Sequence, residues 1–290
     1  MEIIRVEDED LKIIEAKRRR LFRAVSQPLN AQIIWDNIRR YQHQRIIVIC
    51  NTVSQAQGIY RDLHNLQESL EVDLEDNLEN NLENNLKITL LHSRFLAEHR
   101  AQKETYLRDK FAQNWQQQND KTCEVLISTQ VIEAGINITC QVLYSQLSPM
   151  NSLLQRAGRC ARFSGEMGEV LVYKSVEFDR ENQELANTDL FEVEISENTE
   201  QPKESYLPYK KETCLETWQV LQAHTISENK NDRVGFRLEE EWINQVHQKE
   251  DLLNLKLINN SQMEFESKYE AAVFRGDESQ ASALIRKVDN

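Results

Sequence analysis

The chain has 290 residues, of which 40% are hydrophobic, so its length and composition predict about two packed domains. Its longest aliphatic runs, such as residues 46–50, are too short to cross a bilayer, and its acidic N-terminus is unlike a signal peptide, so we expect a cytoplasmic protein with no membrane partner. The net charge of −13 argues against a broad basic surface, although residues 1–174 are nearly neutral and residues 175–290 carry most of the negative charge.

The predicted elements begin with a charged helix over residues 7–23, which Pro28 is expected to end, so residues 1–29 are interpreted as a helical lead or linker. Over residues 30–174, apolar strand-like segments alternate with helical patterns. This alternation predicts an α/β domain, a parallel sheet flanked by helices. The expected strands are residues 46–50, 88–92, 125–128, 142–144 and 170–173.

Three further segments have a different character. Residues 73–86 repeat a polar Leu-Glu-Asn/Asp-Asn pattern, which predicts a surface loop because asparagine is a poor helix former. Residues 175–211 are acidic and contain two prolines, which is typical of a linker. In residues 212–290, apolar residues such as Leu215, Trp218 and Leu221 recur at helical spacing and predict the core of a helical C-terminal domain.

The cysteines and histidines do not predict a metal site. The five cysteines include no C-x-x-C pair and no zinc spacing, so we expect buried, reduced thiols. Most of the histidines are scattered among polar residues. We therefore assign no metal-binding residue.

Residues 155–162, QRAGRCAR, are the most informative segment of the chain. The pattern predicts that Gln155, Arg156, Arg159 and Arg162 lie on the first turns of a helix. Arg159 and Arg162 are three apart and would share a helical face, where two guanidinium groups can neutralise charge that spreads over a γ-phosphoryl group. For an isolated Arg-x-x-Arg the alternative is an ordinary amphipathic helix with a basic face.

The segment upstream, residues 123–138, supports the phosphate interpretation. A short apolar strand is followed by Ser128 and Thr129, and then by Glu133, Gly135 and Asn137. A strand that ends in hydroxyl, amide and glycine residues is typical of the carboxyl edge of an open α/β sheet, where ligands bind.

The segments TQVIEAG and QRAGRC together resemble motifs V and VI of superfamily 2 helicases. Their residue sequences resemble specifically the CRISPR-associated helicase of type I systems. Residues 45–63 resemble motif IV of that family and residues 90–104 resemble its motif IVa. The four motifs stand in the order of the family. The resemblance implies that residues 30–174 are the second RecA-like domain and that residues 212–290 begin the C-terminal helical domain, which is expected to be cut short.

The chain has no Gly-x-x-x-x-Gly-Lys-Ser/Thr loop, no Asp-Glu-x-His box and no His-Asp nuclease pair. The resemblance therefore implies half of an ATP-dependent DNA helicase, with ATP and Mg²⁺ held mainly by a first RecA-like motor domain encoded in the same gene or in another. This chain alone is expected to be inactive. The resemblance also implies single-stranded DNA and a CRISPR effector complex as partners.

The resemblance implies a role for each motif residue. Arg159 and Arg162 match arginine fingers that reach the γ-phosphate of ATP, and Gln155 matches a residue that contacts phosphate or the attacking water. Arg156 matches a residue that bridges toward acidic groups of the partner domain. Asn137 stands where the family usually has an aspartate near the ribose, so an amide would make that contact. The positions assigned to nucleotide binding are Glu133, Gly135, Asn137 and Arg156.

Five residues match positions that hold the backbone of one DNA strand, a contact that positions the strand without reading its sequence. They are Thr52, Ser93, Arg94, Ser128 and Thr129. Thr52 also suits the N-cap of the following helix, and Ser93 and Arg94 also suit a tight turn. Two functional alternatives remain: a fragment of a DNA-repair helicase of superfamily 2, and a non-catalytic product of a split or truncated gene.

Overall fold

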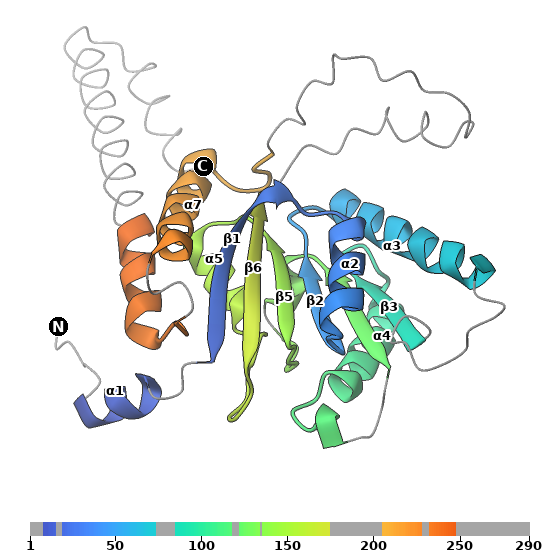
Figure 1. The fold of residues 1–290 in the computed structure, drawn as a ribbon, viewed down its shortest axis with the longest axis horizontal. Helices are drawn as coiled ribbons and strands as arrows, with labels where there is room; N and C mark the ends of the chain where they lie inside the picture. The colour runs from blue at the N-terminus through green and yellow to red at the C-terminus, as the bar shows by residue number, and fades with distance from the viewer. Residues whose placement is uncertain are drawn as a thin grey trace, which may run out of the picture. The chain divides into compact units, whose positions relative to one another are not determined.

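The computed structural model describes residues 8–15, 19–73, 85–117, 122–133, 135–174, 205–227 and 232–247. Six parallel strands form one sheet in the order β1-β6-β5-β2-β4-β3, with helices packed against it (Figure 1). The predicted fold class, a parallel sheet flanked by helices, is therefore confirmed. The strands are β1 Arg20–Pro28, β2 Arg45–Ile49, β3 Leu86–Leu91, β4 Cys123–Ser128, β5 Val142–Gln146 and β6 Gly168–Lys174. The α-helices are α1 Asp8–Glu15, α2 Ala31–Tyr41, α3 Val53–Asp73, α4 Ala97–Lys110, α5 Met150–Ala157 and α7 Lys211–Ile226.

Two compact units make up the chain, residues 1–242 and residues 243–290. The sheet and all the helices named above lie in the first unit. Our division at residues 30, 175 and 212 remains a prediction, and residues 175–204 and 248–290 lie outside the described residues, as do residues 74–84 of the polar repeat.

Five of the six strands coincide with the expected segments, and the edge strand β1 does not. We predicted a helix over residues 7–23, but the chain forms α1 and then the strand β1, which pairs with β6 in the register Phe22↔Val170. Phe22 is fully buried, and its ring meets the Trp242 ring edge-on with centroids 5.3 Å apart. The local apolar pattern fits either element, so the distant partners Val170 and Trp242 decide between them.

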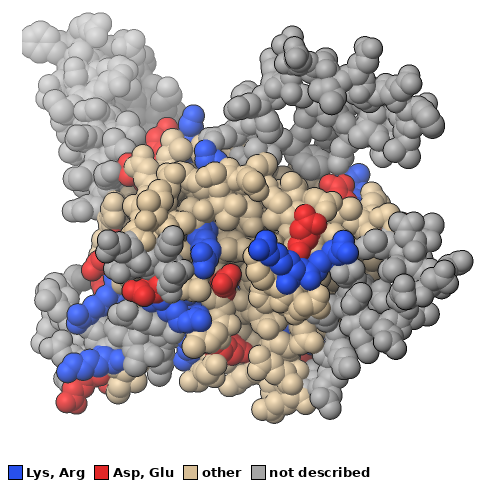
Figure 2. All heavy atoms as spheres, viewed as in Figure 1, with Lys and Arg blue, Asp and Glu red and all other residues tan. Residues whose placement is uncertain are grey.

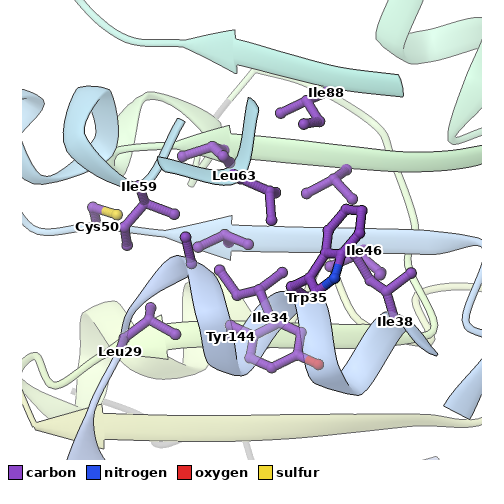
Figure 3. Close-up of a cluster of buried hydrophobic side chains, with 14 of the residues drawn as sticks. Leu29, Ile34, Trp35, Ile38, Ile46, Cys50, Ile59, Leu63, Ile88 and Tyr144 are labelled. Atoms are coloured by element: carbon purple, nitrogen blue, oxygen red, sulfur yellow. The ribbon is translucent and has the colours of Figure 1, made fainter. Parts of the chain in front are cut away.

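Helix α2 packs on one face of the sheet because its apolar residues follow a helical period. Its buried residues are Ala31, Ile34, Trp35 and Ile38, at spacings of three and four. Ile34 and Ile38 contact the cluster of apolar side chains shown in Figure 3, to which β2 and α3 also contribute. The side chain of Asn30 accepts a hydrogen bond from the Ile33 N–H at 2.9 Å and so caps the first turn of α2.

Every residue of β2 and β4 is buried, as expected for central strands that are covered on both faces. Ile49 aligns with Ser128 on β4 and with Ser145 on β5. The residues that follow these three strands therefore meet at one edge of the sheet. This carboxyl edge carries the segments that resemble helicase motifs IV, V and VI.

All five cysteines are free and buried, so the prediction of buried, reduced thiols is confirmed. Burial raises the pKa of the Cys50 and Cys123 thiols to about 12. In the part of the chain that the structure covers, no helix is both long enough and apolar enough to cross a membrane.

Candidate nucleotide and nucleic-acid site

The guanidinium group of Arg156 lies at the centre of the site and is fully buried at the end of α5. Its Nε donates to Glu133 Oε1 at 2.8 Å in an ion pair, and its Nη2 donates to the Tyr209 hydroxyl at 2.8 Å. We expected Arg156 to bridge toward another domain, but its side chain is instead bound inside this one. A buried guanidinium is stable only with such partners, which explains why it faces inward.

The other bonds of Arg156 join it to the carboxyl edge of the sheet. Nη1 donates to Asn51 Oδ1 and Ser145 Oγ, both at 3.1 Å, and to the Gln146 carbonyl at 3.0 Å. The Asn51 N–H donates to Gln146 Oε1 at 2.7 Å, and the Asn51 carbonyl accepts from Gln130 Nε2 at 3.0 Å. Asn51 therefore ties β2 to β5, to the motif V segment and to Arg156.

The sequence interpretation missed Asn51, although one signal was available. Asn51 is a polar residue two positions beyond a strand whose five residues are all apolar except the first. A polar residue at that position of a parallel sheet is a candidate for the ligand edge. Tyr209 gave no comparable signal because it belongs to the segment interpreted as a linker.

Arg159 is nearly buried, with 7% of its surface exposed. Its Nε donates to the Ile132 carbonyl at 2.9 Å, and its Nη2 donates to the Glu133 carbonyl at 2.7 Å. Burial lowers the pKa of Arg159, the charge of Arg162 lowers it further, and the Glu133 carboxylate opposes both. Arg159 thus fixes the segment that contains Glu133 by holding two successive carbonyl groups.

Arg162, in contrast, is exposed. Its Nε donates to Asn137 Oδ1 at 2.6 Å, and its Nη1 donates to the Gly158 carbonyl at 3.2 Å. Its backbone N–H donates to Thr139 Oγ1 at 3.1 Å. The structure therefore brings Arg162 and Asn137 together at the surface.

The prediction that residues 155–162 form the first turns of a helix is wrong. Helix α5 ends at Ala157 with Gly158 as its C-cap, so Arg159 and Arg162 follow the helix and share no helical face. Cys160 pairs in parallel with Cys140, and Ala161 has a φ of 44°, an uncommon conformation for a residue other than glycine. This pairing turns the backbone out of the helix. Gln155 remains on α5 and is exposed.

Gly135 lies in the loop that joins Glu133 to Asn137. It is exposed, its φ is 87°, and a Cβ atom there would meet nothing within 4 Å. The backbone conformation, and not the lack of space, is therefore the reason for a glycine at this position.

The predicted DNA-contacting residues fall into two groups. Ser93 and Arg94 are exposed and Thr52 is half-buried. Ser128 is fully buried and donates its hydroxyl to the Leu91 carbonyl at 2.7 Å, and Thr129 is only 2% exposed. The Ser128 and Thr129 side chains are therefore not presented to a strand of DNA, contrary to expectation. The Ser128 hydroxyl instead links β4 to β3.

The structural roles that the sequence also suggested for Thr52, Ser93 and Arg94, a helix N-cap and a tight turn, are both present in the structure. Thr52 precedes α3, and its Oγ1 accepts from the Gln55 N–H at 3.3 Å, as an N-cap does. His92 closes a turn, because its Nδ1 accepts from the Arg94 N–H at 3.2 Å and its ring stacks on Phe95 at 4.4 Å. Ser93 and Arg94 lie exposed at the tip of that turn. A capping or turn-forming role leaves them available for phosphate contacts.

The side chains at this edge suit one wall of a phosphate site. Arg162 and Gln155 are exposed donors, which anionic oxygens accept. Among the described residues, no group of three or more His, Cys, Asp or Glu residues could hold a metal ion. On the face shown in Figure 2, basic and acidic side chains are mixed, with Lys and Arg gathered over α2, and no broad basic surface is present on that face.

A parallel sheet of this order, with arginines of a QRAGRCAR segment and hydroxyl and amide groups at its carboxyl edge, is similar to the RecA-like domains of superfamily 2 helicases. Comparison with known proteins shows which family this segment resembles. Residues 42–165 match the family model described as "CRISPR-associated nuclease/helicase Cas3, C-terminal". The predicted resemblance is therefore confirmed, because residues 42–165 are similar to the C-terminal helicase region of Cas3 proteins.

Curated relatives and a solved structure are also similar to this chain. The Cas3 nuclease/helicase of Streptococcus thermophilus is 32% identical over 115 residues, which are 40% of this chain and 10% of that protein. The Cas3 of Escherichia coli strain K12 is 29% identical over 118 residues, 41% of this chain and 11% of that protein. The crystal structure of T. fusca Cas3 matches 92% of this chain and 27% of that chain with a TM-score of 0.56 and 18% identity, which shows a shared fold. The matches thus span about a tenth to about a quarter of the relatives' length.

Proposed function

We propose that this chain is the C-terminal half of an ATP-dependent DNA helicase or translocase of CRISPR antiviral defence. It supplies an arginine finger and single-stranded DNA contacts to a first RecA-like motor domain, encoded in the same gene or in another. The observation that carries the proposal is the exposed Arg162, held beside Asn137 at the carboxyl edge of a RecA-like sheet.

Arg162 is the finger that reaches the γ-phosphoryl group. Its guanidinium is exposed, and its two bonds to Asn137 and Gly158 join it to neighbours at the surface, so it can exchange one of them for a phosphate oxygen. Positive charge placed there stabilises the negative charge that develops in the transition state. Arg159 is nearly buried and acts mainly by fixing the loop, with only its remaining N–H groups directed to phosphate.

The other residues at this edge complete the nucleotide wall. Gln155 is exposed and contacts a phosphate oxygen or orients the attacking water. Asn137 lies next to Arg162, and its amide is available to a ribose hydroxyl when Arg162 turns to the phosphate. Gly135 lets the loop pass close to the nucleotide. Glu133 contributes indirectly because its carboxylate is occupied by Arg156.

ATP binding and Mg²⁺ are assigned to the first motor domain. This sequence contains no phosphate-binding loop with the Gly-Lys-Ser/Thr ending, and the described residues offer no metal-binding set. An arginine finger accelerates hydrolysis only when another surface holds the nucleotide and the metal. The chain alone is therefore an inactive half-site.

Single-stranded DNA contacts come from the motif IVa turn. Ser93 and Arg94 lie exposed at its tip, and Thr52 lies half-buried at the start of α3. Such hydroxyl and guanidinium groups hold phosphates without reading bases. The CRISPR effector complex that presents the strand is the proposed protein partner, on the strength of the Cas3 family match. Five free cysteines favour the cytoplasm as the compartment.

The experiment combines the purified full chain with a first motor domain that carries the phosphate-binding loop and the acidic box. Phosphate release is measured for each protein alone and for the mixture, with and without single-stranded DNA. DNA-stimulated turnover that requires both proteins supports the proposal. Turnover by this chain alone, or no stimulation of a motor domain that binds ATP and this chain, contradicts it.

A second experiment measures DNA binding with two variants, one at an exposed residue and one at a buried residue. Arg94→Ala removes an exposed cation and should weaken the single-stranded DNA affinity of the pair and its salt dependence. Ser128→Ala removes a buried hydroxyl and should leave the affinity unchanged, because that hydroxyl is bound to the Leu91 carbonyl. Equal loss in both variants would refute the assignment of the motif IVa turn.

A further inference from the structure

Tyr209 connects the C-terminal part of the chain to the centre of the site. Its hydroxyl accepts a hydrogen bond from Arg156 Nη2 at 2.8 Å, and its ring centroid lies 5.7 Å from the Arg156 guanidinium carbon. Tyr209 lies outside residues 42–165, the segment that matches the helicase family model. A residue beyond the matched region therefore completes the coordination of a motif VI arginine.

The position of Tyr209 is fixed by its own segment. The Tyr209 N–H donates to the Tyr206 carbonyl at 2.8 Å, and α7 begins two residues later, at Lys211. Helix α7 packs on β1 and on α5, the helix that carries Arg156, and it lies beside β1 in Figure 1. The charge of Arg156 also reaches Cys214 in the first turns of α7, where it opposes the effect of burial, which raises the pKa of that thiol.

Hydrogen bonds and one stretch of backbone connect Tyr209 to the arginine finger. Tyr209 accepts from Arg156, Arg156 donates to the Glu133 carboxylate, and the Glu133 carbonyl accepts from Arg159 at 2.7 Å. The loop that starts at Glu133 then carries Asn137, which accepts from Arg162. Each link involves a charged group, and such bonds are about twice as strong as neutral ones.

We infer that Tyr209 is a positioning residue for the arginine finger, through which the segment that leads into α7 controls the loop of residues 133–137. The inference deepens the proposed function and rests on it for the effect on turnover. Loss of the hydroxyl leaves a fully buried Arg156 N–H without its acceptor, which carries a desolvation cost. Arg156 then loosens its hold on Glu133, and Asn137 and Arg162 lose their fixed position.

The first test measures amide hydrogen exchange in the full chain and does not depend on any activity. In Tyr209→Phe, amides of residues 132–137 should exchange about tenfold faster than in the wild type, because the loop loses support from a bond to a charged group. The matched control is Tyr60→Phe, a half-buried tyrosine of α3 whose ring meets His64. That variant should leave exchange in residues 132–137 unchanged.

The second test measures turnover in the mixture with the first motor domain. Tyr209→Phe should lower kcat about three- to tenfold while the KM for ATP and the single-stranded DNA affinity stay within twofold, because the variant displaces a transition-state contact and no ground-state contact. A general loss of structure would not produce this split, and equal circular dichroism spectra and melting curves of the two variants establish that both are folded.

The outcomes separate the inference from the proposed function. Unchanged exchange in Tyr209→Phe overturns the inference, and so does faster exchange with an unchanged kcat. Faster exchange with a lower kcat and an unchanged KM supports it. If the wild-type pair shows no turnover, the proposed function fails, and the exchange result alone then decides whether Tyr209 positions the loop.

Discussion

The Nε of Arg162 donates to Asn137 Oδ1 at 2.6 Å, so the proposed finger is held by a neutral amide. Both side chains are exposed, and the bond joins the motif VI segment to the motif V loop. A neutral acceptor binds a guanidinium less strongly than a carboxylate does. The strength of this contact therefore affects how readily Arg162 exchanges its own loop for a phosphate oxygen.

Asn137→Asp should consequently slow the reconstituted ATPase. The carboxylate would form a charge-assisted bond with Arg162 and retain it, so we expect kcat to fall about three- to tenfold at low salt, with partial recovery as salt screens the pair. Phosphate release at several salt concentrations is the measurement. Asn65→Asp adds the same charge at an exposed position of α3 and serves as the control. An unchanged kcat in Asn137→Asp would show that this contact does not limit the finger.

Substitution of Arg159 should lower the stability of the chain, whereas substitution of Arg162 should lower turnover. Arg162→Ala removes an exposed side chain and should change the free energy of unfolding by less than about 0.5 kcal/mol. Arg159→Ala leaves the Ile132 and Glu133 carbonyls without their donors and should cost about 1–3 kcal/mol. Urea unfolding of the chain alone measures both.

In the reconstituted enzyme, Arg162→Ala should lower kcat by a factor on the order of 10³, as arginine fingers do. Its DNA affinity should stay unchanged. If Arg159→Ala were as stable as the wild type, the two hydrogen bonds to the carbonyl groups would not contribute to stability. Arg159 would then be assigned to phosphate contact instead.

Arg156 should be the most destabilising position of the site. Arg156→Ala removes a fully buried cation and leaves the Glu133 carboxylate unpaired, so we expect a loss of about 3–5 kcal/mol in the free energy of unfolding. The measurement is again urea unfolding, and the exposed Arg162→Ala is the matched control. A loss below about 1 kcal/mol would mean that the buried network does not hold the carboxyl edge together.

His92 should make the stability of the motif IVa turn depend on pH. Burial lowers its pKa below the ordinary value of 6.5, and the charges of Arg94 and Lys103 lower it further. Because the folded-state pKa lies below the unfolded one, the contribution of His92 is complete above about pH 6.5 and is lost as the pH falls through the folded pKa. Protonation of Nδ1 also removes the acceptor for the Arg94 N–H.

The test compares the free energy of unfolding of the wild type and of His92→Gln between about pH 7.5 and about pH 5. The free energy of unfolding of the wild type should exceed that of His92→Gln by less and less as the pH falls. Other histidines with lowered pKa, His43 and His224, are present in both proteins and cancel in the difference. A difference that stays constant over this range would contradict the assignment.

The sequence was sufficient for the elements whose pattern is local. Each central strand is a short apolar run followed by polar residues, and the parallel sheet follows from the alternation of such runs with helices. The edge strand β1 could not be recognised because residues 20–25 fit a helix equally well. Only pairing with β6, which lies far along the chain, decides between the two.

The motifs predicted which residues gather at the site, but they did not predict which side chains face solvent. Arg159 and Ser128 have the residue types that bind phosphates, yet both are used to hold backbone carbonyls. The turn after Ala157 depends on the bridge between Cys140 and Cys160, a tertiary contact with no local signal. The solvent exposure of each motif side chain therefore becomes known only from the structure. It shows that Arg162 is the accessible arginine of the motif.

The most direct test of the account is phosphate release by a first motor domain mixed with either the wild-type chain or Arg162→Ala, in the presence of single-stranded DNA. The account predicts no turnover by this chain alone, DNA-stimulated turnover by the wild-type mixture, and a rate lower by a factor on the order of 10³ with Arg162→Ala, although complex formation is unchanged. Full turnover by the Arg162→Ala mixture would contradict it, because the exposed arginine would then have no part in the reaction.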